Sequence, residues 1–314
     1  MSDIRIVFMG TPDFAVATLD ALLKAKLNVV GVITAPDKPA GRGRKIHQSA
    51  VKKYAIENNL TVLQPTNLKN EEFIASLKSL NANLQIVVAF RMLPKIVWQM
   101  PKYGTFNLHA SLLPNYRGAA PINWAIINGE TKTGVSTFFI DEKIDTGNII
   151  LQDEVAIENN EIVGELHDRL MNTGSKLVVK TIELIKKGEV KTMKQPKTHT
   201  KPAPKIFSET CKINWNDSID NIYNLIRGLN PYPSAWTTLL NGEEKVTLKI
   251  YNAVKELENH NYKNGKVITS KNELKIAVKK GYIKIESLKI AGKRKMDTKS
   301  LLNGYAFSEN SRVR

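Results

Sequence analysis

Cysteine and long apolar runs are almost missing from this sequence. Its 314 residues include one cysteine, Cys211, which can form neither an intrachain disulfide nor a thiolate metal cluster. We expect a free, buried thiol. No run reaches the roughly 18 apolar residues that could span a bilayer, and the N-terminus lacks a basic stretch followed by an apolar one. We therefore expect a cytoplasmic protein with no membrane partner.

Two common ligand-binding patterns are also missing. None of the five histidines lies in an HxH or HExxH pattern, so we expect no metal site. The first apolar run leads into MGTPDF, where a dinucleotide-binding turn would have GxGxxG. Only Gly10 is present there, and Pro12 has no backbone amide to donate to a phosphate. These differences argue against a nicotinamide enzyme.

The sequence has fewer acidic than basic residues. It contains 30 Asp and Glu and 46 Lys and Arg, which gives a formal net charge of +16. The surplus is uneven, with 20 basic and 18 acidic residues over 1–185, 7 and 1 over 186–205, and 19 and 11 over 206–314. A basic C-terminal part is expected if it binds a polyanion. A solvated lysine-rich surface would give the same surplus, so the charge alone leaves both interpretations open.

What is present is a folded composition, 42% hydrophobic and 24% charged, at a length that suggests two domains. The first 150 residues alternate apolar runs with segments of helical period. We predict strands over 4–9, 27–34, 84–89, 105–109 and 134–140, and helices over 14–24, 48–58, 71–80 and 121–128. This alternation predicts an α/β fold: a Rossmann-like, doubly wound, mostly parallel sheet that binds ligands at the carboxyl ends of its strands.

The remaining sequence predicts a closing helix over 162–187 and then a linker, because KTMKQPKTHTKPAPK (191–205) is polar and contains proline without apolar periodicity. Beyond it we expect a helix over 218–228 and strands over 235–240, 246–252, 265–269, 274–277 and 282–290. Several short strands predict a small OB-like β-barrel. We thus expect an α/β catalytic domain over 1–190, a linker over 191–205 and a basic domain over 206–314.

Polar side chains stand near the ends of two predicted strands. Asn107 and His109 are two residues apart on one strand, so their side chains project from the same face. Asp145 follows the 134–140 strand in a turn that contains Gly147, and we expect adjacent strand ends to bring it near His109. An Asn-x-His pair by itself would more simply be explained as satisfying backbone groups at the end of a strand.

These side chains suit attack of an amine on a carbonyl group. The Asn107 amide, assisted by His109, can stabilise the carbonyl oxygen as it gains charge. Histidine titrates near neutral pH, so His109 can relay a proton from the attacking amine to the leaving nitrogen. Asp145 would hold the imidazole in orientation.

The residues after His109 read ASLLPNYRGAAPINWAIINGE. With Asn107 and His109, this block resembles the N-x-H-x-S-L-L-P-x-Y-R-G-A-A-P signature of the methionyl-tRNA formyltransferase family, almost without a break over residues 107–121. The resemblance implies that Asn107, His109 and Asp145 are catalytic. It also implies that four residues border the formyl donor, 10-formyltetrahydrofolate: Ser111, Leu112, Leu113 and Pro114.

Three further segments extend the resemblance over the whole chain. FMGTPDFA resembles the first loop of the family, which puts Phe14 near the folate. APDKPAGRGRK (35–45) resembles a basic loop that reaches the tRNA acceptor end, and RGLNPYPSAWT (227–237) and IAGKRKM (290–296) resemble its tRNA-binding half. The implied tRNA contacts are Arg42, Arg44, Lys45, Lys293, Arg294 and Lys295. The implied activity is formylation of initiator methionyl-tRNA for translation initiation. We expect a monomer, although the sequence itself does not fix the oligomeric state.

One segment departs from the family pattern. Phe90 and Arg91 in VVAFRMLP stand where the family has Tyr and Gly. The related glycinamide ribonucleotide formyltransferases have Met-Arg-Ile-Leu at this place and contact the pterin largely through the backbone. The resemblance therefore implies that Arg91, Met92 and Leu93 border the folate in the same way.

Two other functions remain open from the sequence. A formyltransferase for a sugar or nucleotide amine would share the catalytic block but would not need the GRGRK loop and a basic barrel. A non-catalytic RNA-binding protein on a transferase fold would need the charge but not Asn107, His109 and Asp145. An assay of formyl transfer separates the second from both enzymes.

Overall fold

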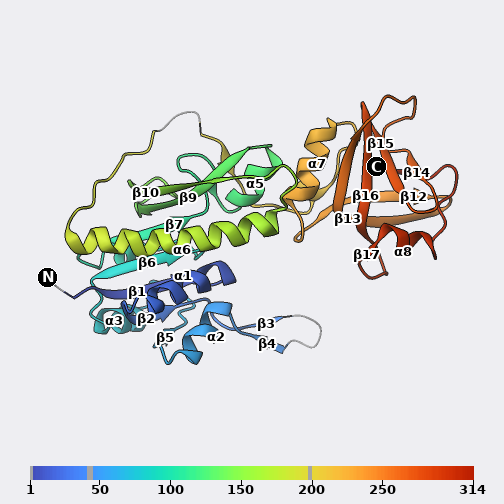
Figure 1. Cartoon of the computed structure of the whole chain (residues 1–314). Helices are drawn as coiled ribbons and strands as arrows, with labels where there is room; N and C mark the ends of the chain where they lie inside the picture. Colours follow the sequence, from blue (N-terminus) through green and yellow to red (C-terminus); the bar gives the residue numbers. More distant parts are fainter. Residues whose placement is uncertain (1–2, 41–44, 197–199) are drawn as a thin grey trace. The chain divides into compact units, whose positions relative to one another are not determined.

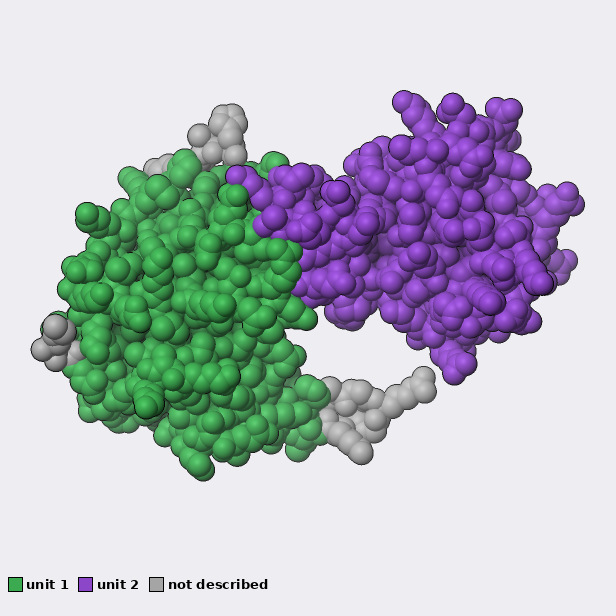
Figure 2. All heavy atoms as spheres, viewed as in Figure 1, with its two compact units in different colours: residues 1–118, 133–155, 167–202 green, residues 119–132, 156–166, 203–314 purple. Residues whose placement is uncertain are grey.

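The structure is a computed structural model that describes residues 3–40, 45–196 and 200–314. The predicted contacts Arg42 and Arg44 lie outside the described residues, and for Lys45 only the backbone is described. The chain divides into two compact units (Figure 2). Unit 1 comprises residues 1–118, 133–155 and 167–202, and unit 2 comprises residues 119–132, 156–166 and 203–314.

Unit 1 is built on a seven-stranded sheet in the order β10-β9-β7-β6-β1-β2-β5. The strands are β1 (Arg5–Gly10), β2 (Asn28–Ile33), β5 (Val62–Leu63), β6 (Leu84–Val88), β7 (Thr105–His109), β9 (Lys132–Phe139) and β10 (Ile149–Ala156). The strands from β5 to β7 are mutually parallel, and β9 is antiparallel to β7. All residues of β6 are buried, as expected for a strand covered on both faces. The predicted mostly parallel α/β sheet is confirmed.

Helices cover both faces of this sheet. They are α1 (Asp13–Lys24), α2 (Ala50–Glu57), α3 (Glu71–Ser79), α4 (Lys95–Trp98) and α6 (Val163–Lys187). One face carries α3 and α4, whose Phe73, Leu77 and Val97 share a core with Val87. On the other face α6 crosses β7 (Figure 1), with Gly174 against Leu108, and Thr181 shares a 2.8 Å hydrogen bond with Thr137 on β9.

Side-chain caps explain where α2 and α3 begin. The side chains of Ser49 and Asn70 accept hydrogen bonds from Lys52 N and Phe73 N, which caps α2 and α3. The strands β3 (Lys38–Ala40) and β4 (Lys45–His47) form a two-stranded ladder that the sequence did not predict. Within the described ranges, no helix has the length and apolar character that a membrane span needs.

Unit 2 contains an antiparallel barrel. Its strands are β12 (Ala235–Asn241), β13 (Glu244–Leu257), β14 (Val267–Thr269), β15 (Leu274–Val278), β16 (Gly281–Ile290), β17 (Met296–Asp297) and β18 (Arg312–Val313). The outermost strands of the sheet meet, because Val267 N donates to Ser311 O and Val313 N donates to Gly265 O, at 3.1 and 2.8 Å. Register shifts near Asn252 bend β13 around the barrel. The predicted small β-barrel is confirmed.

Three α-helices lie wholly within unit 2: α5 (Pro121–Ile127), α7 (Ile219–Gly228) and α8 (Thr298–Leu302). We expected α5 as part of the α/β domain, but it groups with unit 2 because it packs on α7. Asn123 Nδ2 donates to Gly228 O at 2.8 Å, and Arg227 Nη1 donates to Glu161 O at 3.2 Å. The boundaries 1–190, 191–205 and 206–314 stay a prediction.

Cys211 is free and buried, as predicted, at the end of the 3-10 helix η1 (Glu209–Cys211). Burial raises the pKa of its thiol. The group therefore stays protonated at neutral pH, which makes it a poor nucleophile.

Candidate active site

The parallel strands end at one edge of the sheet, and the order in which the chain adds them reverses between β1 and β6. From β1 the chain adds β2 and β5 on one side, and then returns to add β6 and β7 on the other. Ligands of doubly wound sheets bind outside the strand ends at such a reversal. Asn107 and His109 lie at this edge, at the end of β7.

His109 is held by contacts on both ring nitrogens. The side chain is buried, and Nε2 lies 2.8 Å from the carbonyl oxygen of Tyr116. A carbonyl oxygen only accepts, so Nε2 carries the proton in this bond. Nδ1 faces Asp145 Oδ2 at 3.9 Å, which is too long for a direct hydrogen bond. In the neutral ring, Nδ1 is therefore the nitrogen that can take up a proton.

Asn107 is half-buried, and its amide oxygen has an unusual environment. Its Oδ1 is buried and has no hydrogen-bond partner among the residues that the structure describes. A buried polar atom without a partner is destabilising, typically by about 1–3 kcal/mol, and is rare in native proteins. Such an arrangement is expected of a side chain that binds a ligand rather than of one that satisfies the end of a strand.

Asp145 adopts a left-handed backbone conformation, with φ of 54°. Aspartate is one of the few residues besides glycine that tolerate this region. The carboxylate accepts a hydrogen bond from Gly118 N at 2.9 Å, in the segment that follows His109. This bond orients Oδ2 beside the imidazole.

Asp145 does not reach His109 through adjacent strand ends, so that prediction is wrong. The strand before Asp145 is antiparallel to β7, so its end, Phe139, lies opposite Phe106 near the start of β7. The loop over 140–148 brings Asp145 close instead. Gly147 is essential to this loop, because a β-carbon there would lie 1.6 Å from the carbonyl oxygen of Phe139.

Gln195 supports the loop and was not predicted from the sequence. Its Nε2 donates to Asp145 O at 3.0 Å and to Gly147 O at 2.7 Å. Its Oε1 accepts from Arg117 Nε and Nη2 at 3.1 and 2.7 Å. The side chain is 5% exposed, although it lies in the segment that we expected to be a linker. No local pattern marks it, because its partners are far away in the sequence.

Replacing Gln195 by Leu is expected to lower kcat roughly 10- to 100-fold, because a small shift of a catalytic group can cost this much. The loop would lose the hydrogen bonds that Gln195 donates to Asp145 O and Gly147 O, and Arg117 would lose its acceptor Oε1. Steady-state kinetics measure the effect, and the exposed neighbour Lys194, changed to Leu, is the matched control. An unchanged kcat for Gln195→Leu would show that the loop keeps its position without this side chain.

The residues predicted to border the folate differ in their exposure. The Ser111 side chain is buried and donates to Asn115 O at 2.7 Å, and Leu113 shares a small core with Phe138 and Ile149. Leu112 and Pro114 are half-buried. Ser111 and Leu113 thus fix the shape of the segment, which leaves mainly backbone and the other two side chains to meet a ligand.

The other folate candidates follow β1 and β6, the two strands at the reversal. Phe14 on α1 is buried, and the centroid of its ring lies 5.3 Å from that of the His167 ring in an edge-to-face arrangement. Arg91 donates to the carbonyl oxygens of Thr66 and Pro65, and burial lowers the pKa of its guanidinium. Met92 is 67% exposed, whereas Leu93 is buried in the core. Leu93 can therefore contribute only its backbone to a ligand.

The basic residues predicted to contact tRNA in unit 2 lie in the turn between β16 and β17. Lys293, Arg294 and Lys295 are all exposed. The ammonium groups of Lys293 and Lys295 lie 5.7 and 4.3 Å from the ring centroids of Tyr305 and Tyr251. Cation–π contacts of this kind hold the side chains over the barrel surface.

Comparison with known proteins agrees with this fold. Residues 4–182 match the Formyl transferase family, and residues 205–306 match the Formyl transferase C-terminal domain. A sugar 3N-formyl transferase, WlaRD, solved with dTDP and 5-N-formyl-THF, has a TM-score of 0.66 at 23% identity over 94% of this chain and 100% of its own. HypX from Aquifex aeolicus, in complex with tetrahydrofolic acid, has a TM-score of 0.65 at 18% identity over 96% of this chain and 47% of its own. These two likenesses show the fold alone.

Closer relatives define the group within this class. The methionyl-tRNA formyltransferase of Flavobacterium johnsoniae is 61% identical over 100% of both chains. That of Bacteroides fragilis is 52% identical over 98% of this chain and 97% of its own. The chain therefore belongs to the methionyl-tRNA formyltransferase family.

Proposed function

We propose that the chain transfers the formyl group of 10-formyltetrahydrofolate to the α-amino group of initiator methionyl-tRNA, with Asn107, His109 and Asp145 as its catalytic residues. The observation that carries the proposal is the end of β7, where a buried amide oxygen without a partner and an imidazole facing a carboxylate occur together. The family membership supplies the acceptor.

Each of the three side chains has one task. As the amine nitrogen bonds to the formyl carbon, Asn107 Nδ2 donates a hydrogen bond that stabilises the negative charge on the formyl oxygen. His109 Nδ1 takes the proton that the amine loses and returns it to the folate nitrogen as the old carbon–nitrogen bond breaks. Asp145, 3.9 Å from Nδ1, stabilises the imidazolium in between. The products are N-formylmethionyl-tRNA and tetrahydrofolate.

The attacking amine needs no strong base. A free α-amino group has a pKa of about 7.7–8.0, so roughly a tenth of it is neutral near pH 7. The enzyme must therefore remove a proton only after the new bond has formed, which a histidine can do.

The family is folate-dependent, and the residues around the reversal suit such a donor. We place the pterin near Phe14, the backbone of Arg91, Met92 and Leu93, and the segment Ser111, Leu112, Leu113 and Pro114. The apolar side chains among them offer a surface for a flat ring, and exposed backbone groups fix its orientation.

The acceptor is tested by offering several amines side by side. The protein is incubated with 10-formyltetrahydrofolate and methionyl-tRNA, another aminoacylated tRNA, or a nucleotide-linked amino sugar, and the formylated product is identified. We expect methionyl-tRNA to be formylated, with a KM that rises steeply with salt because phosphates are engaged. Formylation of the amino sugar alone would contradict the proposal, as would a KM for methionyl-tRNA that does not respond to salt.

A further inference from the structure

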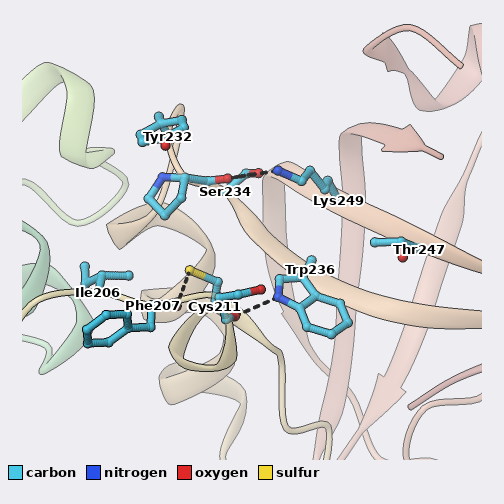
Figure 3. A pocket seen from close by; sticks show the side chains of 10 residues that line it. Ile206, Phe207, Cys211, Tyr232, Ser234, Trp236, Thr247 and Lys249 are labelled. Atoms are coloured by element: carbon cyan, nitrogen blue, oxygen red, sulfur yellow. Dashed lines mark hydrogen bonds between the residues drawn. The ribbon is translucent and has the colours of Figure 1, made fainter. Parts of the chain in front are cut away.

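Unit 2 contains a hollow of its own. Its volume is about 470 Å³, within the range of about 300–1,000 Å³ that is typical of small-ligand sites. Three aromatic side chains line it: Phe207 from one segment of the chain, and Tyr232 and Trp236 from the segment that leads into β12 (Figure 3). Neither the catalytic residues nor the predicted basic contacts belong to this lining.

Two of these rings are more exposed than a structural role requires. Tyr232 is 82% exposed and Phe207 is 59% exposed. Trp236 is fixed, because its ring packs against the core of unit 2 and its Nε1 donates to Ser208 O at 2.8 Å. Clustered apolar surface on a folded protein commonly marks a binding site. The hollow thus has one rigid wall and two rings that are free to meet a ligand.

Ammonium groups stand around the same rings. Lys205 Nζ lies 5.5 Å from the centroid of Phe207, and Lys212 Nζ lies 5.7 Å from that of Trp236. Lys249 lines the hollow itself, where its Nζ donates to Pro233 O at 3.2 Å. Proteins bind unpaired nucleotides with this combination, in which rings stack on the bases and cations pair with the phosphates. An apolar peptide would use the rings but not the cations.

We propose that this hollow binds unpaired nucleotides of the RNA substrate. Bases stack against the rings of Phe207 and Tyr232, and the adjoining phosphates approach Lys205, Lys212 and Lys249. The inference rests on the proposed function, because it takes the acceptor to be a tRNA. It adds a second place at which that RNA is held, and it demands no particular base, since every base has a face that can stack.

The test measures the Kd of uncharged tRNA by filter binding for the full chain and for Phe207→Ala and Tyr232→Ala. Each variant is expected to bind about tenfold more weakly, the usual effect of losing one stacked ring. Tyr232→Phe should bind like the wild type, because it keeps the ring. Tyr262→Ala is the matched control, since Tyr262 is 51% exposed on the same unit and lies outside the hollow.

A second RNA probe distinguishes base stacking from nonspecific electrostatic attraction to the phosphates. A fully base-paired RNA of the same length should bind the wild type and Tyr232→Ala equally, because it offers no unpaired base. If the double variant Phe207→Ala/Tyr232→Ala keeps the wild-type Kd for tRNA, the inference is overturned and the proposed function still stands. An equal loss for both RNAs would also overturn it. A wild type that neither binds nor formylates tRNA would instead refute the proposed function.

Discussion

His109→Ala is expected to lower kcat by roughly 100- to 10,000-fold, the range for loss of a positioned acid–base group. The variant keeps Asn107 to stabilise the formyl oxygen but has no group to move the proton between the two nitrogens. KM for methionyl-tRNA should change little, because the predicted RNA contacts lie elsewhere in the chain. Steady-state kinetics at saturating donor measure both constants.

Thermal unfolding is the control for His109→Ala. The ring donates one hydrogen bond, to Tyr116 O, so some stability is lost with it. A folded variant with wild-type kcat would remove His109 from the mechanism. Adding Asn107→Ala to His109→Ala should cost less than the product of the two single effects, because the two groups act on one intermediate.

Gly147→Ala is expected to lower kcat about 100-fold or more, because a shift of about 1 Å at a catalytic group has this effect. The new β-carbon would lie 1.6 Å from Phe139 O, and backbone cannot give way as a side chain can. The loop must therefore move, and with it Asp145 and the bond from Gln195 Nε2 to Gly147 O. The forced packing should also destabilise the fold by about 1–3 kcal/mol.

The matched control is Gly304→Ala, where a β-carbon would meet nothing within 4 Å. It should leave both kcat and the unfolding midpoint unchanged. Should Gly147→Ala retain wild-type kcat, the position of the 140–148 loop would not matter for catalysis, and Asp145 would lose its role.

Periodicity predicted most of the fold because the elements bury their side chains regularly. The strand over 84–88 is a fully buried run, and the helix over 163–187 keeps an apolar stripe, so both are visible in the sequence. Strand direction is not, since a side-chain pattern reads the same way in both directions. The antiparallel pairing of β9 with β7 was missed for this reason, and so was the path by which Asp145 reaches His109.

The residues of the candidate site were also only partly predictable from the sequence. Asn107 and His109 could be found from their spacing on one strand and from the block that follows them. Gln195 could not, because it is one polar residue in a polar segment, and only its distant partners make it special. Phe207 stands in no motif, and Tyr232 lies in the segment RGLNPYPSAWT without being marked within it, so their exposure around one hollow appears only in three dimensions.

The side chain of Asn107 offers the most direct test of the proposed catalytic site. For Asn107→Ala, the single-turnover rate of formyl transfer from 10-formyltetrahydrofolate to methionyl-tRNA is measured together with the free energy of unfolding. Loss of a group that stabilises the oxyanion should lower the rate by about 100- to 1,000-fold. Stability should not fall by more than about 0.5 kcal/mol, because Oδ1 has no partner to lose among the described residues. A rate close to that of the wild type, or a loss of activity explained by unfolding, would contradict the assignment of the β7 end as the catalytic site.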